Sequence, residues 1–454
     1  MSDTQQPSEN QAVNTGVDEH YPDARYGWYV VVLLTIAYIF SYIDRIVLGL
    51  VLEPMKADLG LSDTNMGLLG GAAFAIFYAT MGIPLGWLVD RKPRKFIVAL
   101  GAILWSVATM ATGVARGFAQ LFVARMAVGF GEAALSPSAM SLISDLFAPE
   151  RRAKAIAFYS MALGVGSAIA YLVVGAILDY AETADLSYLA FLGVDKPWQV
   201  VFLAVGFPGI LLGIVFLTVK EPERKQTKLS ATDGKGAATF RQTLGYIWGH
   251  RLPLIGVTVM VSGMTAIAYT SMWLPPLFER TWGWSAATFS SYNGSVLLIL
   301  APTSILFWGW VIDHFNQKGR HDMPFVITQA GLALLVVSSV TFPLMPDVWT
   351  AFIISQFANI GFTMVTAGGI TALLAILPSE LRGQAVALYY MVISMTGLLI
   401  GPSVVPLFTD FVFGDESLIR YSMSLVPLLY SGTILLFSGY VGRAYRRELA
   451  KFTE

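Results

Sequence analysis

The feature that most constrains this chain is a series of twelve long apolar runs. The hydrocarbon core of a bilayer, about 30 Å thick, is crossed by a helix of roughly 20 apolar residues. Hydrophobic residues make up 55% of the 454 residues and charged residues only 13%, too few to cover a water-facing surface of this size. We therefore predict an all-α membrane protein with twelve transmembrane helices. The runs cover about 28–53, 66–89, 96–116, 118–147, 152–178, 198–219, 251–278, 288–312, 324–344, 348–376, 382–409 and 420–442.

The longest polar break, residues 220–250, divides these runs six and six. We predict an N-terminal six-helix bundle over 28–219, a cytoplasmic linker over 220–250 and a C-terminal six-helix bundle over 251–442. Residues 1–27 are expected to form a disordered cytoplasmic tail without the pattern of a signal peptide, and residues 443–454 a second cytoplasmic tail.

A weak internal repeat relates the two halves. Gly86-Trp87-Leu88-Val89-Asp90 follows the second run, and Gly309-Trp310-Val311-Ile312-Asp313 follows the eighth. Pro149-Glu150-Arg151-Arg152 before the fifth run has a counterpart in Ser379-Glu380-Leu381-Arg382 before the eleventh. Two landmarks, each repeated six runs later, favour two pseudo-symmetric bundles, which is typical of secondary transporters with a substrate site between the halves.

Basic residues predict the orientation. With both termini in the cytoplasm, 22 of the 29 Lys and Arg residues fall in inner segments and five in outer segments. The other two, Arg45 and Arg125, lie inside runs. We therefore expect a multi-pass protein of the cell (inner) membrane.

Composition also excludes several functions. The chain has no Cys, none of its four His lies inside a long apolar run, and its net charge is −1. These counts argue against disulfides, a metal site and a nucleic-acid partner. No nucleophile–base set is visible, so we expect a protein that is not an enzyme and has no cofactor.

Four charged residues stand well inside apolar runs: Asp44 and Arg45 in the first, Arg125 and Glu132 in the fourth. A charge at such depth costs at least about 2.5 kcal/mol, so each requires a reason. At a rise of about 1.5 Å per residue, Asp44 lies roughly 13 Å below the outer end of its run. Arg125 and Glu132 lie about 10 and 21 Å below the outer end of theirs. We therefore expect Arg125 to be able to pair with either carboxylate.

Two interpretations of these charges stay open. If the pairing changes between conformations, Asp44, Glu132 and Arg125 couple proton binding to transport, which we favour. If it does not change, a static salt bridge locks the two helices together.

The second half carries no such charges and offers aromatic and hydroxyl groups instead. We predict substrate contacts from both halves, with the proton as the coupling ion. The residues are Arg45, Arg125, Tyr42, Tyr269, Trp273, Asn359 and Thr363.

Two motifs resemble the major facilitator superfamily. Gly86-Trp87-Leu88-Val89-Asp90-Arg91-Lys92-Pro93-Arg94-Lys95 is similar to its signature between spans 2 and 3, with Pro93 in place of a glycine. Arg125-Met126-Ala127-Val128-Gly129-Phe130-Gly131 is similar to its span-4 motif. The resemblance implies twelve helices in two bundles, alternating access, and a cytoplasmic latch formed by Asp90, Arg91, Arg94 and Asp145 that is closed in the outward-open state.

Within the superfamily, the first half resembles the Spinster family of lipid transporters. The specific strings are Tyr42-Ile43-Asp44-Arg45 and Gly129-Phe130-Gly131-Glu132-Ala133. The resemblance implies proton-coupled transport of amphiphilic lipids, such as lysophospholipids or phosphorylated sphingoid bases, by a protein that works as a monomer among membrane lipids. The alternatives are a drug/proton antiporter, which the lack of proline in Gly164-Val165-Gly166-Ser167 disfavours, and an organic-anion exchanger, which would require basic residues in the second half.

Overall fold

The computed structural model describes residues 21–224 and 240–453, and within these residues it is helical and contains no strand. Twelve helices or helix pairs there are long and apolar enough to cross a membrane. Each coincides with one of the twelve apolar runs, so the predicted fold class is confirmed.

The first half contains six spans. Helix α1 (Ala24–Leu50) forms span 1 and the short α2 (Leu52–Leu59) follows it. The others are α3 (Asp63–Gly70) with α4 (Ala72–Arg91), α5 (Arg94–Gly113), α6 (Phe118–Glu132) with α7 (Leu135–Leu146), α8 (Pro149–Thr183) and α9 (Pro197–Thr218). Residues 1–20 of the predicted tail lie outside the described residues, and α1 begins inside that tail, at Ala24.

The second half begins with α11 (Phe240–Gly249), which lies in the predicted linker. Its spans are α12 (Arg251–Tyr269) with the 3-10 turn η2 (Thr270–Trp273) and α13 (Leu274–Trp282), α14 (Ala286–Gln317), α15 (Met323–Thr341), α16 (Val348–Ala375), α17 (Arg382–Leu407), and α18 (Ile419–Val426) with α19 (Thr433–Thr453). The predicted C-terminal tail is the end of α19.

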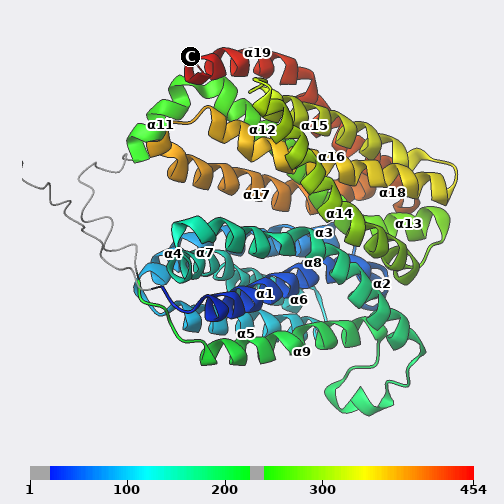
Figure 1. Cartoon of the computed structure of the whole chain (residues 1–454). Coiled ribbons are helices and arrows are strands. Elements are labelled where there is room, and N and C mark those ends of the chain that lie inside the picture. The colour runs from blue at the N-terminus through cyan, green and yellow to red at the C-terminus, as the bar shows by residue number, and fades with distance from the viewer. Residues whose placement is uncertain (1–20, 225–239, 454) are drawn as a thin grey trace, which may run out of the picture.

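The two bundles meet at the end of the molecule away from the chain termini and diverge toward the termini (Figure 1). Contacts between the halves join α8 to α14, α3 and α4 to α17, and α1 to η2 and α13. The bundles are therefore joined on the side away from the termini, and their helices diverge on the terminal side in this conformation.

Glycine makes this close approach possible at two positions. A Cβ atom at Gly49 of α1 would lie 2.7 Å from the carbonyl oxygen of Met272, and one at Gly67 of α3 would lie 2.7 Å from that of Pro402. Real Cβ atoms do not come so near to backbone atoms, so a larger residue at either position would push the halves apart.

Candidate functional site

The four intramembrane charges lie on two helices of the first bundle. Asp44 and Arg45 are on α1, and Arg125 and Glu132 on α6. Asp44, Arg125 and Glu132 are each 2% exposed. The Arg45 side chain retains 14% of its surface. We call these four residues the central charge cluster.

Local sequence explains where Glu132 stands. A Cβ atom at Gly129 would lie 2.5 Å from the carbonyl oxygen of Phe74 on α4, and one at Gly131 would lie 2.8 Å from that of Gly101 on α5. The two glycines therefore allow α6 to pack closely against two neighbours. Helix α6 then ends at Glu132. The carboxylate is thus fixed at a helix end in the middle of the bundle.

Glu132 is paired with Arg45. Its Oε2 atom accepts hydrogen bonds from Arg45 Nε at 2.9 Å, from Arg45 Nη2 at 2.8 Å and from the Ser41 hydroxyl at 2.6 Å. Its other oxygen, Oε1, is buried without a hydrogen-bond partner in the structure. Two charged donors on one oxygen make a strong, directional contact between α1 and α6.

Arg125 does not make the pairing that the sequence suggested. It donates to the backbone carbonyl oxygens of Asp44, at 3.2 Å, and Leu69, at 3.5 Å. No ion pair joins it to Asp44 or Glu132 in this conformation among the described residues. Asp44 Oδ1 is also buried without a hydrogen-bond partner. The cluster therefore holds one direct ion pair, Arg45–Glu132, and two further buried charges close to it.

Aromatic rings surround the Arg45 guanidinium. Its carbon lies 5.4 Å from the ring centre of Tyr42, 5.0 Å from that of Phe74 and 4.9 Å from that of Tyr78. Tyr269 on α12 of the second half also lies within electrostatic range of Arg45. Ring faces attract a cation. The partly exposed guanidinium of Arg45 therefore lies against a wall of aromatic rings to which both halves contribute.

The other predicted substrate residues of the second half lie differently. Trp273 has no exposed surface and donates from Nε1 to the carbonyl oxygen of Pro402 at 2.9 Å. Thr363 is buried and bonded to Ser304 at 2.6 Å. Asn359 is half-buried and donates to Gln356 Oε1 at 3.0 Å. In this conformation only Tyr269 joins the central charge cluster, and the role of the other three stays a prediction.

The predicted latch is partly assembled. Arg94 at the start of α5 is buried and forms an ion pair with Asp145 near the end of α7. Its Nε also donates to Glu221 at 2.7 Å. Arg91 stacks on Trp87, with 4.2 Å to the ring centre, and Asp90 is exposed. The Arg94–Asp145 pair lies within the first half and Glu221 belongs to the linker, so this pair forms in a conformation whose bundles diverge on the terminal side.

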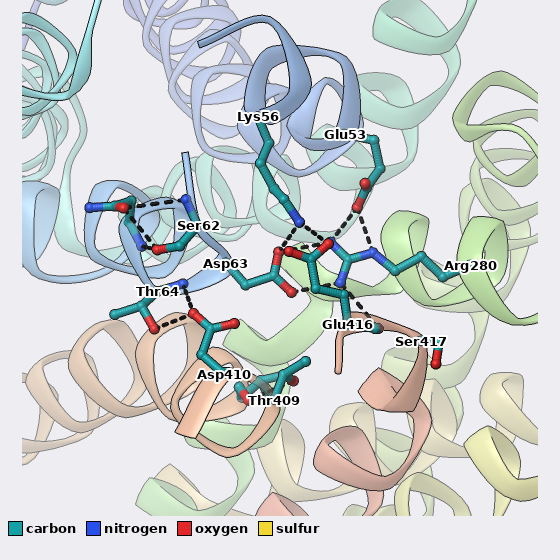
Figure 2. A network of polar contacts seen from close by, with 12 residues as sticks. Glu53, Lys56, Ser62, Asp63, Thr64, Arg280, Thr409, Asp410, Glu416 and Ser417 are labelled. Carbon is teal, nitrogen blue, oxygen red and sulfur yellow. Dashed lines mark hydrogen bonds and ion pairs between the residues drawn. The ribbon is translucent and has the colours of Figure 1, made fainter. Parts of the chain in front are cut away.

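An ion network that sequence reasoning missed joins the two halves on the side away from the termini, and Figure 2 shows its residues. Arg280 on α13 donates to Glu53 at 2.8 and 2.6 Å and to Asp63 at 2.6 and 2.8 Å. Lys56 on α2 bonds to Asp63 at 2.7 Å and forms an ion pair with Glu416, which precedes α18. We call these five residues the outer ion network, where outer means the side away from the termini; they connect the two halves through Arg280 and Glu416.

A second polar contact lies beside the outer ion network. Asp410 of the second half accepts hydrogen bonds from the backbone nitrogen of Thr64 at 2.8 Å and from its hydroxyl at 2.6 Å (Figure 2). Asp63 and Thr64 are the first two residues of α3, where unpaired backbone N–H groups favour a carboxylate. The start of α3 is therefore held by acidic and basic side chains of the other half.

A family model decides the classification. The Major Facilitator Superfamily model matches residues 34–402, which include both halves. This chain belongs to the major facilitator superfamily. Among curated relatives, it is 26% identical to an MFS-type efflux pump of Mycolicibacterium smegmatis over 88% of this chain and 87% of that protein. It is 28% identical to protein spinster of Drosophila melanogaster over 55% of this chain and 38% of that protein.

The solved structures agree. A bacterial homologue of the human lysosomal transporter Spinster, in an inward-facing and unoccupied conformation, superposes with a TM-score of 0.77 at 25% identity. The match covers 95% of this chain and 98% of that one. The resemblance to Spinster proteins is thus confirmed.

Proposed function

We propose that this facilitator is a proton-coupled transporter of amphiphilic lipids with an anionic headgroup. One observation carries the proposal: Arg45, the partly exposed cation at the aromatic wall, is paired with the buried acid Glu132. The similarity to Spinster proteins, which the sequence resembles as a family of lipid transporters, supports the choice of lipids. Other relatives are an efflux pump, a quinolone resistance transporter and a probable L-galactonate transporter.

Charge balance supplies the coupling. With both acids ionised, Asp44, Arg45, Arg125 and Glu132 carry no net charge. Adding a proton to one acid leaves a net charge of +1 in a medium of low dielectric, which is unfavourable unless an anion compensates it. Binding of one proton therefore favours binding of one anionic headgroup, and the loss of either favours the release of the other.

Arg45 is the residue that would change partners. When Glu132 is protonated it no longer attracts the guanidinium as an ion, and Arg45 is free to bind a phosphate through two parallel hydrogen bonds. The tyrosine hydroxyls nearby can add further hydrogen bonds, and the apolar tail can lie against the second bundle. In this scheme Arg45, one of the two arginines that the sequence predicts as substrate contacts, binds the headgroup, and the other, Arg125, neutralises the remaining acid.

Alternating access follows from the two bundles. The outer ion network holds the outer mouth closed in this conformation, and rocking of the bundles about the central site would break it. We place both termini in the cytoplasm and the protein in the inner membrane, because basic residues are concentrated on the terminal side. We further propose that it works as a monomer with no cofactor besides the proton.

Drug efflux is the second candidate, because two relatives that match 88% and 90% of this chain are an efflux pump and a quinolone resistance transporter. The same charge balance predicts the opposite pH dependence of binding for a cationic drug. A cation entering the site replaces a proton on the acids, so its affinity falls as the pH falls. An anionic lipid needs the proton, so its affinity rises as the pH falls.

The test is substrate binding and uptake in proteoliposomes across a panel of lysophospholipids, sphingosine phosphate, quinolones and sugar acids, with and without a pH gradient. We expect lysolipid or sphingoid-phosphate uptake that depends on the gradient, with tighter binding at acidic pH. Uptake of quinolones alone, with tighter binding at alkaline pH, would favour efflux. Uptake that is indifferent to pH in every case would contradict proton coupling.

A further inference from the structure

An apolar groove lies on the outer surface of the first bundle, away from the central site. It has a volume of about 410 Å³ and runs between α4 and α5. Both helices pack against α6 but hardly touch each other, which leaves the space between them. Its floor contains Ile97, Gly101, Gly131 and Ala134, and its walls contain Leu85, Leu88, Phe96, Leu100, Leu104 and Phe130.

The groove faces the lipid and not the second bundle. Helix α5 packs against α6, α7 and α9 of its own half, on the side of the first bundle farthest from the second (Figure 1). Phe96, Leu100 and Leu104 recur every four residues along α5 and form an exposed stripe, with Leu100 65% exposed. A stripe of this kind on a transmembrane helix is covered by acyl chains.

The depth of the groove matches one leaflet. It begins at Lys92 and Pro93, just before α5, and ends at Leu104. Eleven residues of helix from Pro93 to Leu104 span about 17 Å. Half of a hydrocarbon core is about 15 Å thick, so the groove reaches from the terminal-side membrane surface to the middle of the bilayer.

A free cation stands at the mouth of this groove. Lys92 is exposed, and its ammonium group forms no hydrogen bond or ion pair with the part of the chain that the structure describes. The neighbouring acid Glu221 is already engaged by Arg94 Nε and by the backbone nitrogens of Arg94 and Lys95. Arg224 is also engaged, because its Nη2 donates to the backbone oxygens of Val89 and Lys92. Among the described residues at this mouth, the Lys92 ammonium is therefore the group left to meet a ligand.

We propose that this groove binds one acyl chain of an anionic phospholipid of the terminal-side leaflet, with its headgroup on Lys92. The apolar walls select an acyl chain, the length selects a lipid of one leaflet, and the ammonium selects a negative headgroup. A basic residue near the membrane surface is expected to favour an anionic lipid over a zwitterionic one by about fivefold. This site does not depend on the identity of the transported substrate.

The test uses the absence of Cys from the chain. A single cysteine replaces Val107, which is exposed on α5 one turn beyond Leu104, and carries a bimane fluorophore. The protein is reconstituted into phosphatidylcholine vesicles that contain increasing fractions of phosphatidylglycerol or phosphatidylcholine with brominated acyl chains. We expect half-maximal quenching at about fivefold lower fractions of the brominated phosphatidylglycerol.

Lys92→Gln should abolish this preference, and Lys154→Gln, at another exposed lysine on the same side, should leave it intact. A label at Leu436 of α19, which is 84% exposed, reports ordinary lipid contact and should show no preference. Equal quenching by the two lipids at Val107, or a preference that survives Lys92→Gln, would overturn the proposal. Displacement of brominated phosphatidylglycerol by lysophospholipid at equal fractions would also overturn it, because the groove would then take the transported class instead.

Discussion

Replacing Arg280 by Ala should open the outer side of the transporter. Arg280 makes four hydrogen bonds of 2.6 to 2.8 Å with Glu53 and Asp63 of the other half. Its side chain is only 10% exposed, and that of Asp63 is fully buried. Removing one partner from a buried ion pair costs about 3–5 kcal/mol, because the other charge remains buried. All these contacts join the two halves, so the cost falls on the outer-closed state.

The expected size follows from the remaining partners. Lys56 still bonds to Asp63 at 2.7 Å, and Glu53 is partly exposed, so we take the lower limit of about 3 kcal/mol. This corresponds to a change of about 150-fold in the ratio of outer-open to outer-closed molecules. Glu416→Gln is the matched control. Its carboxylate is 52% exposed, and an exposed pair contributes at most about 1 kcal/mol, or about fivefold.

Distances between spin labels measure these populations. Thr183→Cys at the end of α8 and Pro346→Cys before α16 place one label on each half at the outer side, and the chain has no other thiols. We expect a long-distance population in Arg280→Ala that is small in Glu416→Gln. If the two variants shift the distribution equally, the buried part of the outer ion network does not hold the mouth closed, and the reasoning is refuted.

Four further outcomes are expected. Glu132→Gln should remove the pH dependence of substrate binding, measured by titration between acidic and neutral pH; an unchanged profile would point to Asp44. Arg45→Lys should weaken headgroup binding about tenfold or more, since it replaces two guanidinium hydrogen bonds by one, and equal affinity would exclude Arg45 as the headgroup contact. Gly131→Ala should lower stability by about 1–3 kcal/mol in thermal unfolding, because its Cβ would meet the Gly101 oxygen at 2.8 Å, and Gly82→Ala, with nothing within 4 Å, should not. Lys92→Gln should change only the lipid preference of the groove, with substrate binding unchanged.

The fold followed from hydropathy because each span is a local property of the chain. About 20 consecutive apolar residues in lipid have one stable form, a helix, since every backbone group must be paired within the segment. The internal repeat predicted the two bundles, because the same two landmarks recur six spans later. The short helices α2 and α11 were not predicted, because neither is long enough to stand out by hydropathy.

The outer ion network was not predicted because its residues come from segments far apart in sequence. Lys56 and Arg280 were counted only as basic residues that fall outside the spans on the outer side. Their partners lie on α2, α3 and the segment before α18, so no spacing along one helix reveals them. One signal in the sequence was available: basic residues are rare on this side, so each one needs a reason. Pairing with an acidic residue is the simplest reason.

The pairing inside the central charge cluster was not predicted, because depth alone does not account for the direction in which helical side chains point. Helical side chains lean toward the N-terminus of their helix, so those on α1 lean toward the terminal side and those on α6 lean outward. By the rise per residue, Arg45 starts about 9 Å farther out than Glu132, and the two side chains therefore lean toward each other. Arg125 starts farther out than Asp44, so their side chains lean apart, and Arg125 reaches the backbone oxygens of Asp44 and Leu69 instead of the Asp44 carboxylate. Depth indicated four residues that the structure brings together, and the direction of lean explains the pair that it shows.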